Sequence, residues 1–510
     1  MVKRAGGSLL LSVAIDPRSQ RPVSTQLYVI LRDMILAAAF SAGDRLPASR
    51  TLARDLGLSR TTVVEAFDRL TAEGLVESRT GSGTYVSVAL RADRPKPAAA
   101  NAHAAAAPRL SAVMGEAVAR FGDRQRLPHV PRAFTTALPA FDAFPMAQWA
   151  RLSAKYWRGG RDHVMGYGDP CGDVRLRRVI ASHLRANRGI VCDAEQVFIV
   201  GGAQQAFHLI GTTLLDPRDK VWFENPGAIG ARNSLIATGA ELVPVPVDDA
   251  GLRVDEGLRM SPQFRLAFVT PSHQQPLGSV MSLERRFALL HAAEQAGAWI
   301  IEDDYDGEFF FGGRAPPTLK SVDTTGLVIY VGTFSKSLFP ALRLGYLVAP
   351  PALVDVFRAI MSRFLQGVPS STQSVVAEFI DEGHFASHIR RMRRLYAERH
   401  EALRHAAHAK LDRLLELMPT DSGLHSVGYL DRGASEIDIA RAADERRITV
   451  SPIGRFAIAP IAARGLVLGF GGVRPEEIEA GVDVLAEVLE RHARRPSRPS
   501  ALTMPAGPRP

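Results

Sequence analysis

The sequence predicts an α/β protein preceded by a small helical unit, because three regimes of composition and periodicity follow one another along its 510 residues. Residues 20–88 show helical periodicity and end in two short β-type runs. Residues 89–130 are rich in Ala, Pro and Arg and carry little pattern that could bury a face, which is typical of a linker that is extended at its prolines and allows a helix near 111–121. From 131 to 490, short apolar runs alternate with longer helical stretches, and this alternation indicates a parallel sheet covered by helices.

The strands of the large domain are predicted from four apolar runs that are rich in β-branched or aromatic residues. These runs are VFIV (197–200), LAFVT (266–270), WIIEDD (299–304) and VIYVG (328–332). The part from about 351 onward is mainly helical with a few strands, so we expect a smaller α+β unit at its end. The last segment, 491–510, is predicted to be a flexible basic tail.

The charge and the cysteines narrow the class of protein. The net charge is +9, and residues 89–133 hold eight Lys and Arg against three Asp and Glu, while 491–510 hold five Arg and no acid. The basic residues of these segments either attract phosphates without sequence preference or only keep the chain solvated, and both readings stay open. The two cysteines, Cys171 and Cys192, fit a reducing cytoplasm, and no apolar run is long enough to span a membrane.

The N-terminal segment contains three helical patterns, and a tight turn joins the last two. Residues 24–38 form one amphipathic helix, and 46–76 hold two more helical patterns around Gly57-Leu58-Ser59. In the second of these, Val63, Phe67 and Leu70 face inward, while Ser59 is placed to cap the helix. The runs within VESRTGSGTYVSV (76–88) flank Thr80-Gly81-Ser82-Gly83 and predict a hairpin that would serve as a wing.

A helix with a polar, basic first turn is what a recognition helix needs to enter the major groove of DNA. With Leu46-Pro47, Leu56-Gly57 and Glu73-Gly74, the segment closely resembles the GntR family of winged-helix regulators. The resemblance implies binding to double-stranded DNA, and Val64 stands where some members carry a further arginine. The predicted DNA-binding residues are Arg50, Ser59, Arg60, Thr61, Thr62 and Gly83.

The large domain carries the side-chain types that a pyridoxal 5′-phosphate (PLP) site needs: a lysine for the covalent bond, an acid for the pyridine nitrogen, a donor for the phenolate and an anion site. Lys336 follows a predicted strand, and Asp303 and Tyr305 follow another, at the strand ends where α/β sheets bind ligands. Phosphate-binding groups are expected at Gly202, Ala203, Gln204, Thr333, Ser335 and Arg343.

The order and spacing of these motifs resemble the fold-type I aminotransferases, and the whole chain resembles the MocR subfamily of GntR regulators, in which both domains are fused. Further matching motifs are ALPAFDAFPMAQW (137–149), YGDPCGDVRLR (167–177), ENPG (224–227), TPSHQQPLG (270–278) and GLVLGFGG (465–472). The resemblance implies that Lys336 holds PLP covalently, that Asp303 pairs with the pyridinium nitrogen and that Tyr305 donates to the phenolate oxygen. It also implies a head-to-tail homodimer in which Tyr167 reaches the phosphate of the neighbouring subunit. No metal site is expected.

Three positions depart from the aminotransferase pattern. Ala228 replaces an aromatic residue that stacks on the cofactor ring, and Gln275 stands where the regulators have Tyr or Phe and the enzymes have Asn; its amide could still reach the cofactor. Val467 occupies the position of the arginine that clamps a substrate α-carboxylate, and an apolar side chain cannot replace that clamp. Arg455 or Arg464 could substitute for it.

These departures leave three functions to weigh. The leading hypothesis is a DNA-binding regulator whose aminotransferase-like domain senses PLP, an amine or an amino acid. The alternative is a working aminotransferase with DNA binding attached, against which Ala228 and Val467 count. A third, a PLP fold that serves only for dimerisation, is disfavoured because Lys336, Asp303 and Arg343 are all present.

Overall fold

The computed structural model describes two compact units, which divide between residues 109 and 110. The described residues are 13–16, 19–37, 39–79, 82–88, 110–123, 130–160, 164–312, 316–430 and 434–493. Part of the linker predicted at 89–130, most of the tail predicted at 491–510, and Thr80 and Gly81 of the predicted wing lie outside these ranges. No helix among the described residues is both long and apolar enough to cross a membrane.

The described residues of the first unit form three helices and a hairpin. Its elements are α1 (Val23–Leu36), α2 (Ser49–Leu56), α3 (Arg60–Ala72), β1 (Val76–Arg79) and β2 (Gly83–Val86), with β1 and β2 antiparallel. Gly57 ends α2 in the left-handed conformation, and the Ser59 hydroxyl accepts a hydrogen bond from the Thr62 amide to start α3. Val63, Phe67 and Leu70 are buried in its core, which confirms the predicted inward face.

The second unit is built on an eight-stranded sheet in the order β3-β10-β9-β8-β7-β4-β5-β6. Its strands are β3 (Val197–Val200), β4 (Lys220–Asn225), β5 (Glu241–Asp248), β6 (Gly251–Leu252), β7 (Leu266–Val269), β8 (Trp299–Asp304), β9 (Val328–Thr333) and β10 (Gly345–Val348). All four strands predicted from apolar runs are present. Strands β5, β4, β7, β8 and β9 run parallel, so their carboxyl ends meet at one edge of the sheet.

The sheet is mixed and not purely parallel, unlike the sequence expectation. Strand β10 runs antiparallel between β9 and β3. The chain from Thr333 to Gly345 contains only the short helix α13 (Phe334–Ser337) and a single turn at Pro340–Leu342. A segment this short can return the chain antiparallel, whereas a parallel crossover needs a full helix packed on the sheet.

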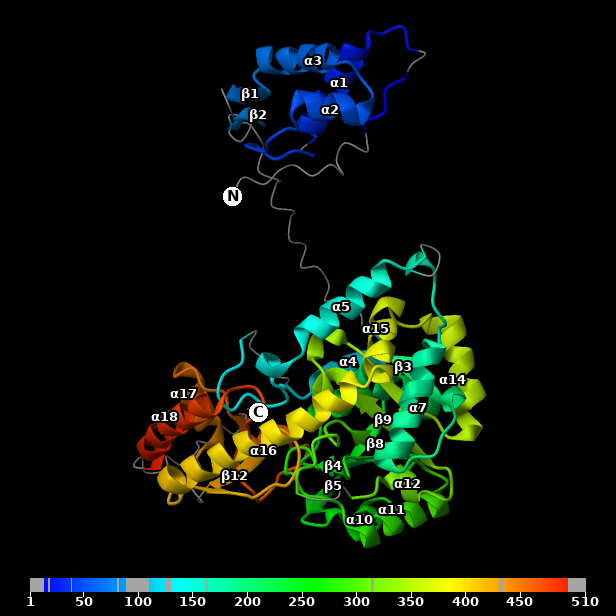
Figure 1. The fold of residues 1–510 in the computed structure, drawn as a ribbon, viewed down its shortest axis with the longest axis vertical. Coiled ribbons are helices and arrows are strands. Elements are labelled where there is room, and N and C mark those ends of the chain that lie inside the picture. Colours follow the sequence, from blue (N-terminus) through cyan, green and yellow to red (C-terminus); the bar gives the residue numbers. More distant parts are fainter. Residues whose placement is uncertain are drawn as a thin grey trace, which may run out of the picture. The chain divides into compact units, whose positions relative to one another are not determined.

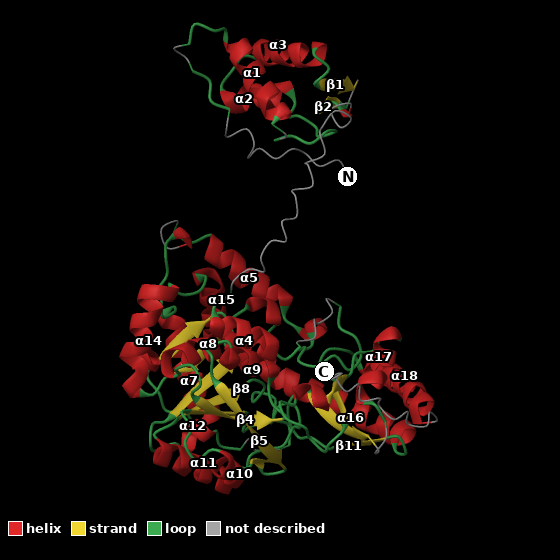
Figure 2. Ribbon diagram, turned by 180° about the vertical axis from the view of Figure 1, so that it is seen from behind, coloured by secondary structure: helices red, strands yellow, loops and turns green. Residues whose placement is uncertain are grey.

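Helices cover both faces of this sheet (Figure 2). They are α5 (Met146–Trp157), α7 (Val174–Arg188), α8 (Ala203–Leu214), α9 (Ile229–Ile236), α10 (Val254–Met260), α11 (Leu283–Ala296), α12 (Leu319–Val322), α14 (Val354–Ile360) and α15 (Ser370–Asp381). Alternate residues of one strand enter different cores: Phe198 packs with α8, α9 and α14, whereas Ile199 packs with α7 and α15. Because both faces of the sheet are buried, successive residues of each strand are apolar, and the strands are continuous apolar runs in the sequence.

The C-terminal part forms a second, four-stranded antiparallel sheet in the order β11-β12-β14-β13. Figure 1 shows this part in orange and red. Its elements are α16 (His384–Leu411), β11 (Leu415–Leu417), β12 (His425–Leu430), α17 (Glu436–Glu445), β13 (Ser451–Pro452), β14 (Gly465–Gly469) and α18 (Pro475–Ala493). This is the smaller α+β unit that the sequence predicted. The loops before β12 and after β13 carry residues to the edge of the large sheet, where they complete a pocket.

Helix α4 (Ala112–Arg120) lies within the range that the sequence analysis assigned to the linker, yet it packs on the second unit. Ala117 is 2% exposed and joins the core formed by α8 and α9, and the Arg120 side chain donates to the Ala240 carbonyl. The sequence pattern allowed a helix near 111–121, but its docking surface depends on residues more than a hundred positions away.

Candidate cofactor and DNA-binding sites

The carboxyl edge of the large sheet forms a pocket that brings together nearly all of the predicted cofactor residues. They arrive from four places: the turn before α8, the end of β8, the loop after β7, and β9 with the turn that follows it. The lining includes Gly202, Ala203, Gln204, Gln275, Asp303, Tyr305, Thr333, Ser335, Lys336 and Arg343. A ligand site at the carboxyl ends of parallel strands is the general rule for open α/β sheets.

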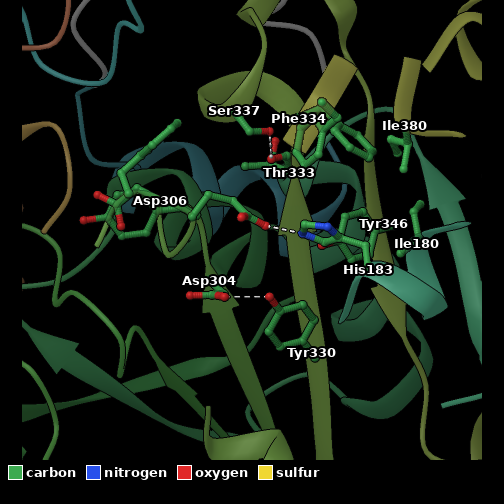
Figure 3. Close-up of a pocket in the computed structure, with 14 residues that line it drawn as sticks. Ile180, His183, Asp304, Asp306, Tyr330, Thr333, Phe334, Ser337, Tyr346 and Ile380 are labelled. Carbon is green, nitrogen blue, oxygen red and sulfur yellow. Dashed lines mark hydrogen bonds and ion pairs between the residues drawn. The ribbon is translucent and has the colours of Figure 1, made fainter. Parts of the chain in front are cut away.

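Of the two adjacent acids that end β8, only Asp303 lines this pocket. Asp304 points to the opposite side, where it pairs with Arg188 at 2.6 Å and accepts a hydrogen bond from the Tyr330 hydroxyl at 2.6 Å. Figure 3 shows that side, with Asp304 facing Tyr330. On the same side, His183 lies 2.6 Å from the carboxylate of Glu308. Because successive side chains of a strand point to opposite faces of the sheet, Asp303 lines the pocket and Asp304 lies on the other side.

Asp303 suits a cationic ring nitrogen. Its side chain is buried, and its Oδ1 atom accepts no hydrogen bond from any residue that the structure describes. Burial, with Asp304, Asp306 and Glu224 adding to it, raises the pKa of Asp303 well above its ordinary value, whereas Lys336 opposes the rise. A buried carboxyl of this kind is stabilised by a positive partner, and a protonated pyridine would be such a partner.

Lys336 lies on α13, directly after β9, so the end of the strand fixes where its side chain begins. Its Nζ atom donates to the carbonyl oxygen of Ala137 at 2.9 Å. Ala137 also lines the pocket and has a positive φ of 64°, a rare conformation for a residue with a side chain. This arrangement holds the amino group in the pocket, where it can react with a bound aldehyde.

One end of the pocket carries the groups expected to bind phosphate. Helix α8 begins there, and Gly202 before it has a φ of 103°, which favours glycine. A Cβ atom added to Gly202 would lie 3.9 Å from an Arg343 guanidinium nitrogen, so this cation lies close to the helix N-terminus. Thr333 and Ser335 line the same pocket, and the Thr333 hydroxyl accepts a hydrogen bond from the Ser335 amide. A helix N-terminus, hydroxyls and a guanidinium together suit a phosphate.

Tyr305 is held by a buried polar group that sequence reasoning missed. Its hydroxyl lies 3.0 Å from Nδ1 of His273, and the same nitrogen lies 2.8 Å from Asp306. Ligand atoms of His273, Asp306 and His425 all lie within 4.8 Å of one another, a grouping that could also hold a metal ion. His273 belongs to the TPSHQQPLG motif, and Asp306 follows Tyr305. Both residues therefore lie in or beside motifs noted in the sequence, but their contact could not be predicted from it.

Two further positions differ from an amino-acid site as the sequence indicated. Ala228 lines the pocket without an aromatic ring. Val467 is 2% exposed and packs with Ile453 and Phe456, so the position of the aminotransferase clamp is an apolar cluster. Of the two arginines considered as substitutes, Arg455 lines the pocket, and Arg464 is exposed and does not.

Tyr167 is the one predicted cofactor residue that the structure does not bring to this pocket. Its side chain is 100% exposed within the single chain. That placement leaves the predicted contact with a neighbouring subunit as a prediction. Pocket residues that the sequence did not single out include Thr136, Ala137, Phe207, Ser451 and Phe456.

The predicted DNA-binding residues of the first unit lie on α2, at the start of α3 and at the start of β2. Arg50, Arg60 and Thr61 are exposed. Ser59 and Thr62 are bonded to each other through their hydroxyls at 2.7 Å, so both also define the start of the helix. Gly83 begins β2 with a φ of 114°, and a Cβ there would meet the Arg45 side chain at 2.8 Å. The glycine thus lets the hairpin lie close to Arg45.

Two known families match the two units. Residues 23–86 match the bacterial regulatory proteins of the gntR family, and residues 140–485 match the aminotransferase class I and II family. The chain is 41% identical over 473 residues to "Probable rhizopine catabolism regulatory protein MocR" of Rhizobium meliloti, covering 93% of this chain and 95% of that protein. It is 33% identical to the "HTH-type transcriptional regulator TauR" of Rhodobacter capsulatus, covering 94% and 99%.

Solved aminotransferases share the fold of the second unit. LysN, the α-aminoadipate aminotransferase of Thermus thermophilus, solved with N-(5′-phosphopyridoxyl)-L-leucine, is 26% identical with a TM-score of 0.66, covering 75% of this chain and 95% of that one. An archaeal alanine:glyoxylate aminotransferase is 26% identical with a TM-score of 0.66, covering 71% and 92%.

Proposed function

The chain belongs to the MocR subfamily of GntR regulators, and from this premise we propose that it is a transcriptional regulator whose aminotransferase-like domain holds PLP and senses a small molecule. The first unit would bind a double-stranded DNA operator through Arg50, Arg60 and the residues around the start of α3. The second would couple the chemistry of its pocket to that binding. Two free, buried cysteines, Cys171 and Cys192, and the regulator family support a cytoplasmic location.

One observation carries the cofactor part of the proposal: a lysine, an unpartnered buried carboxyl oxygen and a guanidinium beside a helix N-terminus share one pocket. Lys336 would hold the cofactor covalently, Asp303 would keep its ring nitrogen protonated, and Tyr305, held by His273, would donate to its phenolate oxygen. Ala203, Gln204, Thr333, Ser335 and Arg343 would bind the phosphate. When bound, PLP supplies an aldehyde that reacts with amines.

Tyr167 supports a homodimer as the working form. The residue is exposed in the single chain, although the resemblance to aminotransferases gives it a role at the phosphate of the adjacent subunit. A head-to-tail pair would place each Tyr167 beside the partner's pocket and would account for this exposure. Analytical ultracentrifugation with and without PLP tests the dimer, and a monomer in both conditions would contradict it.

The experiment that tests the proposed function combines two measurements on the full-length protein. The absorbance spectrum after PLP loading reports the covalent cofactor, and fluorescence anisotropy with labelled DNA upstream of the neighbouring genes reports operator binding. Amines, amino acids and free PLP are then titrated in. We expect visible absorbance and an operator affinity that changes with at least one of these ligands. Absence of the absorbance, or an affinity that no ligand changes, would contradict the proposal.

A catalytically active aminotransferase is the second candidate, favoured by Lys336 and Asp303 standing in one pocket as the chemistry requires. The apolar cluster at Val467 opposes it, because a carboxylate left there without a partner would cost roughly a few kcal/mol of desolvation. We therefore expect common L-amino acids to convert little of the bound cofactor to pyridoxamine phosphate. Rapid conversion by any of them, measured by chromatography of the released cofactor, would favour the enzyme.

A further inference from the structure

The Tyr305 hydroxyl and a buried acid share one ring nitrogen of His273. This nitrogen, Nδ1, lies 2.8 Å from Oδ2 of Asp306 and 3.0 Å from the Tyr305 oxygen. His273 and Asp306 are each 2% exposed, so water competes little for these contacts. A ring nitrogen either carries a proton and donates, or lacks one and accepts. The position of the His273 proton therefore decides whether Tyr305 donates to the ring or accepts from it.

The surroundings of His273 place its proton on Nδ1. A carboxylate 2.8 Å from Nδ1 requires a hydrogen between the two atoms, because two lone pairs would repel each other. The other ring nitrogen, Nε2, is buried and has no hydrogen-bond partner among the residues that the structure describes. A proton on Nε2 would be a buried donor without an acceptor, which is costly, whereas Nδ1–H finds a carboxylate.

A proton on Nδ1 leaves Tyr305 without an acceptor on His273. The Nδ1–H group donates to Asp306 and points its remaining attraction at the Tyr305 oxygen, so the Tyr305 hydroxyl directs its own proton elsewhere. Tyr305 lines the pocket that also contains Lys336. The phenolate oxygen of PLP would be an acceptor for that proton in this pocket.

Asp306 competes with the cofactor for the Tyr305 proton. Burial raises the pKa of Tyr305 well above its ordinary value. The charges of Asp306, Asp303 and Glu224 add to this rise in pKa, as does a hydrogen bond with Asp306. Because the His273 N–H group already occupies Oδ2 of Asp306, the carboxylate accepts less strongly from Tyr305.

The C-terminal part of the chain packs directly on this pair. Gly423, in the loop before β12, has a φ of 77°, and a Cβ atom there would lie 2.7 Å from Oδ2 of Asp306 and would clash with the His273 ring. The His425 ring lies 4.8 Å from the His273 ring, centre to centre, and its Nε2 lies 3.0 Å from the Pro276 carbonyl oxygen. Burial lowers the pKa of His425 to about 4, so this ring brings no charge near neutral pH.

We propose that His273 and Asp306 are positioning residues that keep Tyr305 a hydrogen-bond donor to the phenolate oxygen of PLP, and that they tune the cofactor through this tyrosine. The inference rests on the proposed function and deepens it, because His273 is not among the described residues that line the pocket. A donor on the phenolate oxygen stabilises its negative charge and so weakens its pairing with the protonated nitrogen of the bound Lys336.

The test titrates the full-length, PLP-loaded protein with pH and follows its visible absorbance band. His273→Leu removes the N–H group without changing the net charge of a singly protonated ring, and it lets Tyr305 turn to Asp306. We expect the midpoint of the titration to rise by about one pH unit, the size expected for losing one hydrogen bond to a charged oxygen. The dissociation constant of PLP, measured by titrating the apoprotein, should rise severalfold.

A double-mutant cycle shows whether His273 acts through Tyr305. Tyr305→Phe should raise the midpoint by itself, and adding His273→Leu to it should give no further rise, because the tyrosine proton is already absent. His273→Asn, whose amide N–H lies near the position of Nδ1, should restore much of the wild-type midpoint. His400→Leu is the matched control: it removes another buried histidine, on α16 and outside the pocket lining, and should leave the midpoint unchanged.

Two outcomes would overturn the proposal. The first is that His273→Leu binds PLP and titrates like the wild type. The second is that the shifts of His273→Leu and Tyr305→Phe add up in the double variant, which would mean that His273 does not act through the tyrosine. Differential scanning fluorimetry of the apoproteins checks folding, and His273→Phe takes the place of His273→Leu if the latter does not fold. A wild-type protein without a visible band would instead contradict the proposed function, so the two failures are distinguishable.

Discussion

The two units keep their candidate functional residues in opposite environments. In the first, the proposed DNA contacts Arg50 and Arg60 are exposed to water. In the second, Asp303 is 6% exposed, and Lys336 donates to a carbonyl of the same chain within a pocket. Substitutions at the exposed arginines should therefore leave folding stability unchanged. The pocket is part of the core, so substitutions there should change both folding stability and ligand binding.

The largest effect is expected at Lys336. Lys336→Ala should abolish the visible absorbance of the PLP-loaded protein, because it removes the amine that forms the covalent bond. The circular dichroism spectrum should be kept. Lys220→Ala, an exposed lysine at the start of β4, is the matched control and should keep the absorbance. A Lys336→Ala protein that retains the band would show that the cofactor is held elsewhere.

The next largest effect is expected at Arg60, on DNA binding and not on folding. Arg60→Ala should weaken operator binding by about 1–3 kcal/mol if the side chain reads a base edge, and flatten the preference at that base. Its melting temperature should match that of the wild type, since the residue is exposed. Fluorescence anisotropy titrations with operator DNA measure the effect. Arg54→Ala, at an exposed arginine of α2, is the matched control. Equal affinities of Arg60→Ala and wild type would remove Arg60 from the interface.

Substitution of Asp303 should change folding as well as binding: the apoprotein should become more stable, and cofactor binding should weaken. Burial raises the folded-state pKa of Asp303 above its unfolded value of about 3.9. The folded carboxyl therefore holds its proton more strongly than the unfolded one, so stability falls as pH rises above about 4 until the pH passes the folded pKa. Asn at this position does not titrate.

The apoprotein of Asp303→Asn should therefore melt above the wild type by a margin that grows between about pH 4 and pH 7, on the order of 1–3 kcal/mol of unfolding free energy for a buried group without a partner. Differential scanning fluorimetry across this pH range measures the margin, and PLP titration of the same variant should show weakened binding. A margin that stays constant with pH would mean that Asp303 does not titrate as inferred.

The smallest effect is expected from the basic connection between the units. Replacing Arg91, Arg94, Arg109, Arg124 and Arg126 with Gln should flatten the dependence of log K on log salt by up to about 0.9 for each phosphate that these arginines neutralise. These five positions lie outside the described residues. Arg120, the sixth arginine of the stretch, donates to the Ala240 carbonyl and is left unchanged. An identical slope would show that these charges only solvate the chain.

Most of the fold and most of the candidate site could be predicted from the sequence. Helix caps such as Ser59, strand runs such as VIYVG and the order of motifs around Lys336 are local patterns, and local patterns report local structure. Because parallel strands end at one edge, knowing that Asp303 and Thr333 end strands was enough to expect them together. The family resemblance added the role of each.

The features that sequence reasoning missed depend on contacts between distant segments. The folded chain places β10 antiparallel in the sheet, turns Asp304 toward Arg188 and away from the pocket, and sets His273 against Tyr305. It also brings Arg455 to Asp123, 332 residues away in the chain. The sequence pattern does not show such contacts, because they follow from how the two sheets and residues 110–123 pack together in the folded protein.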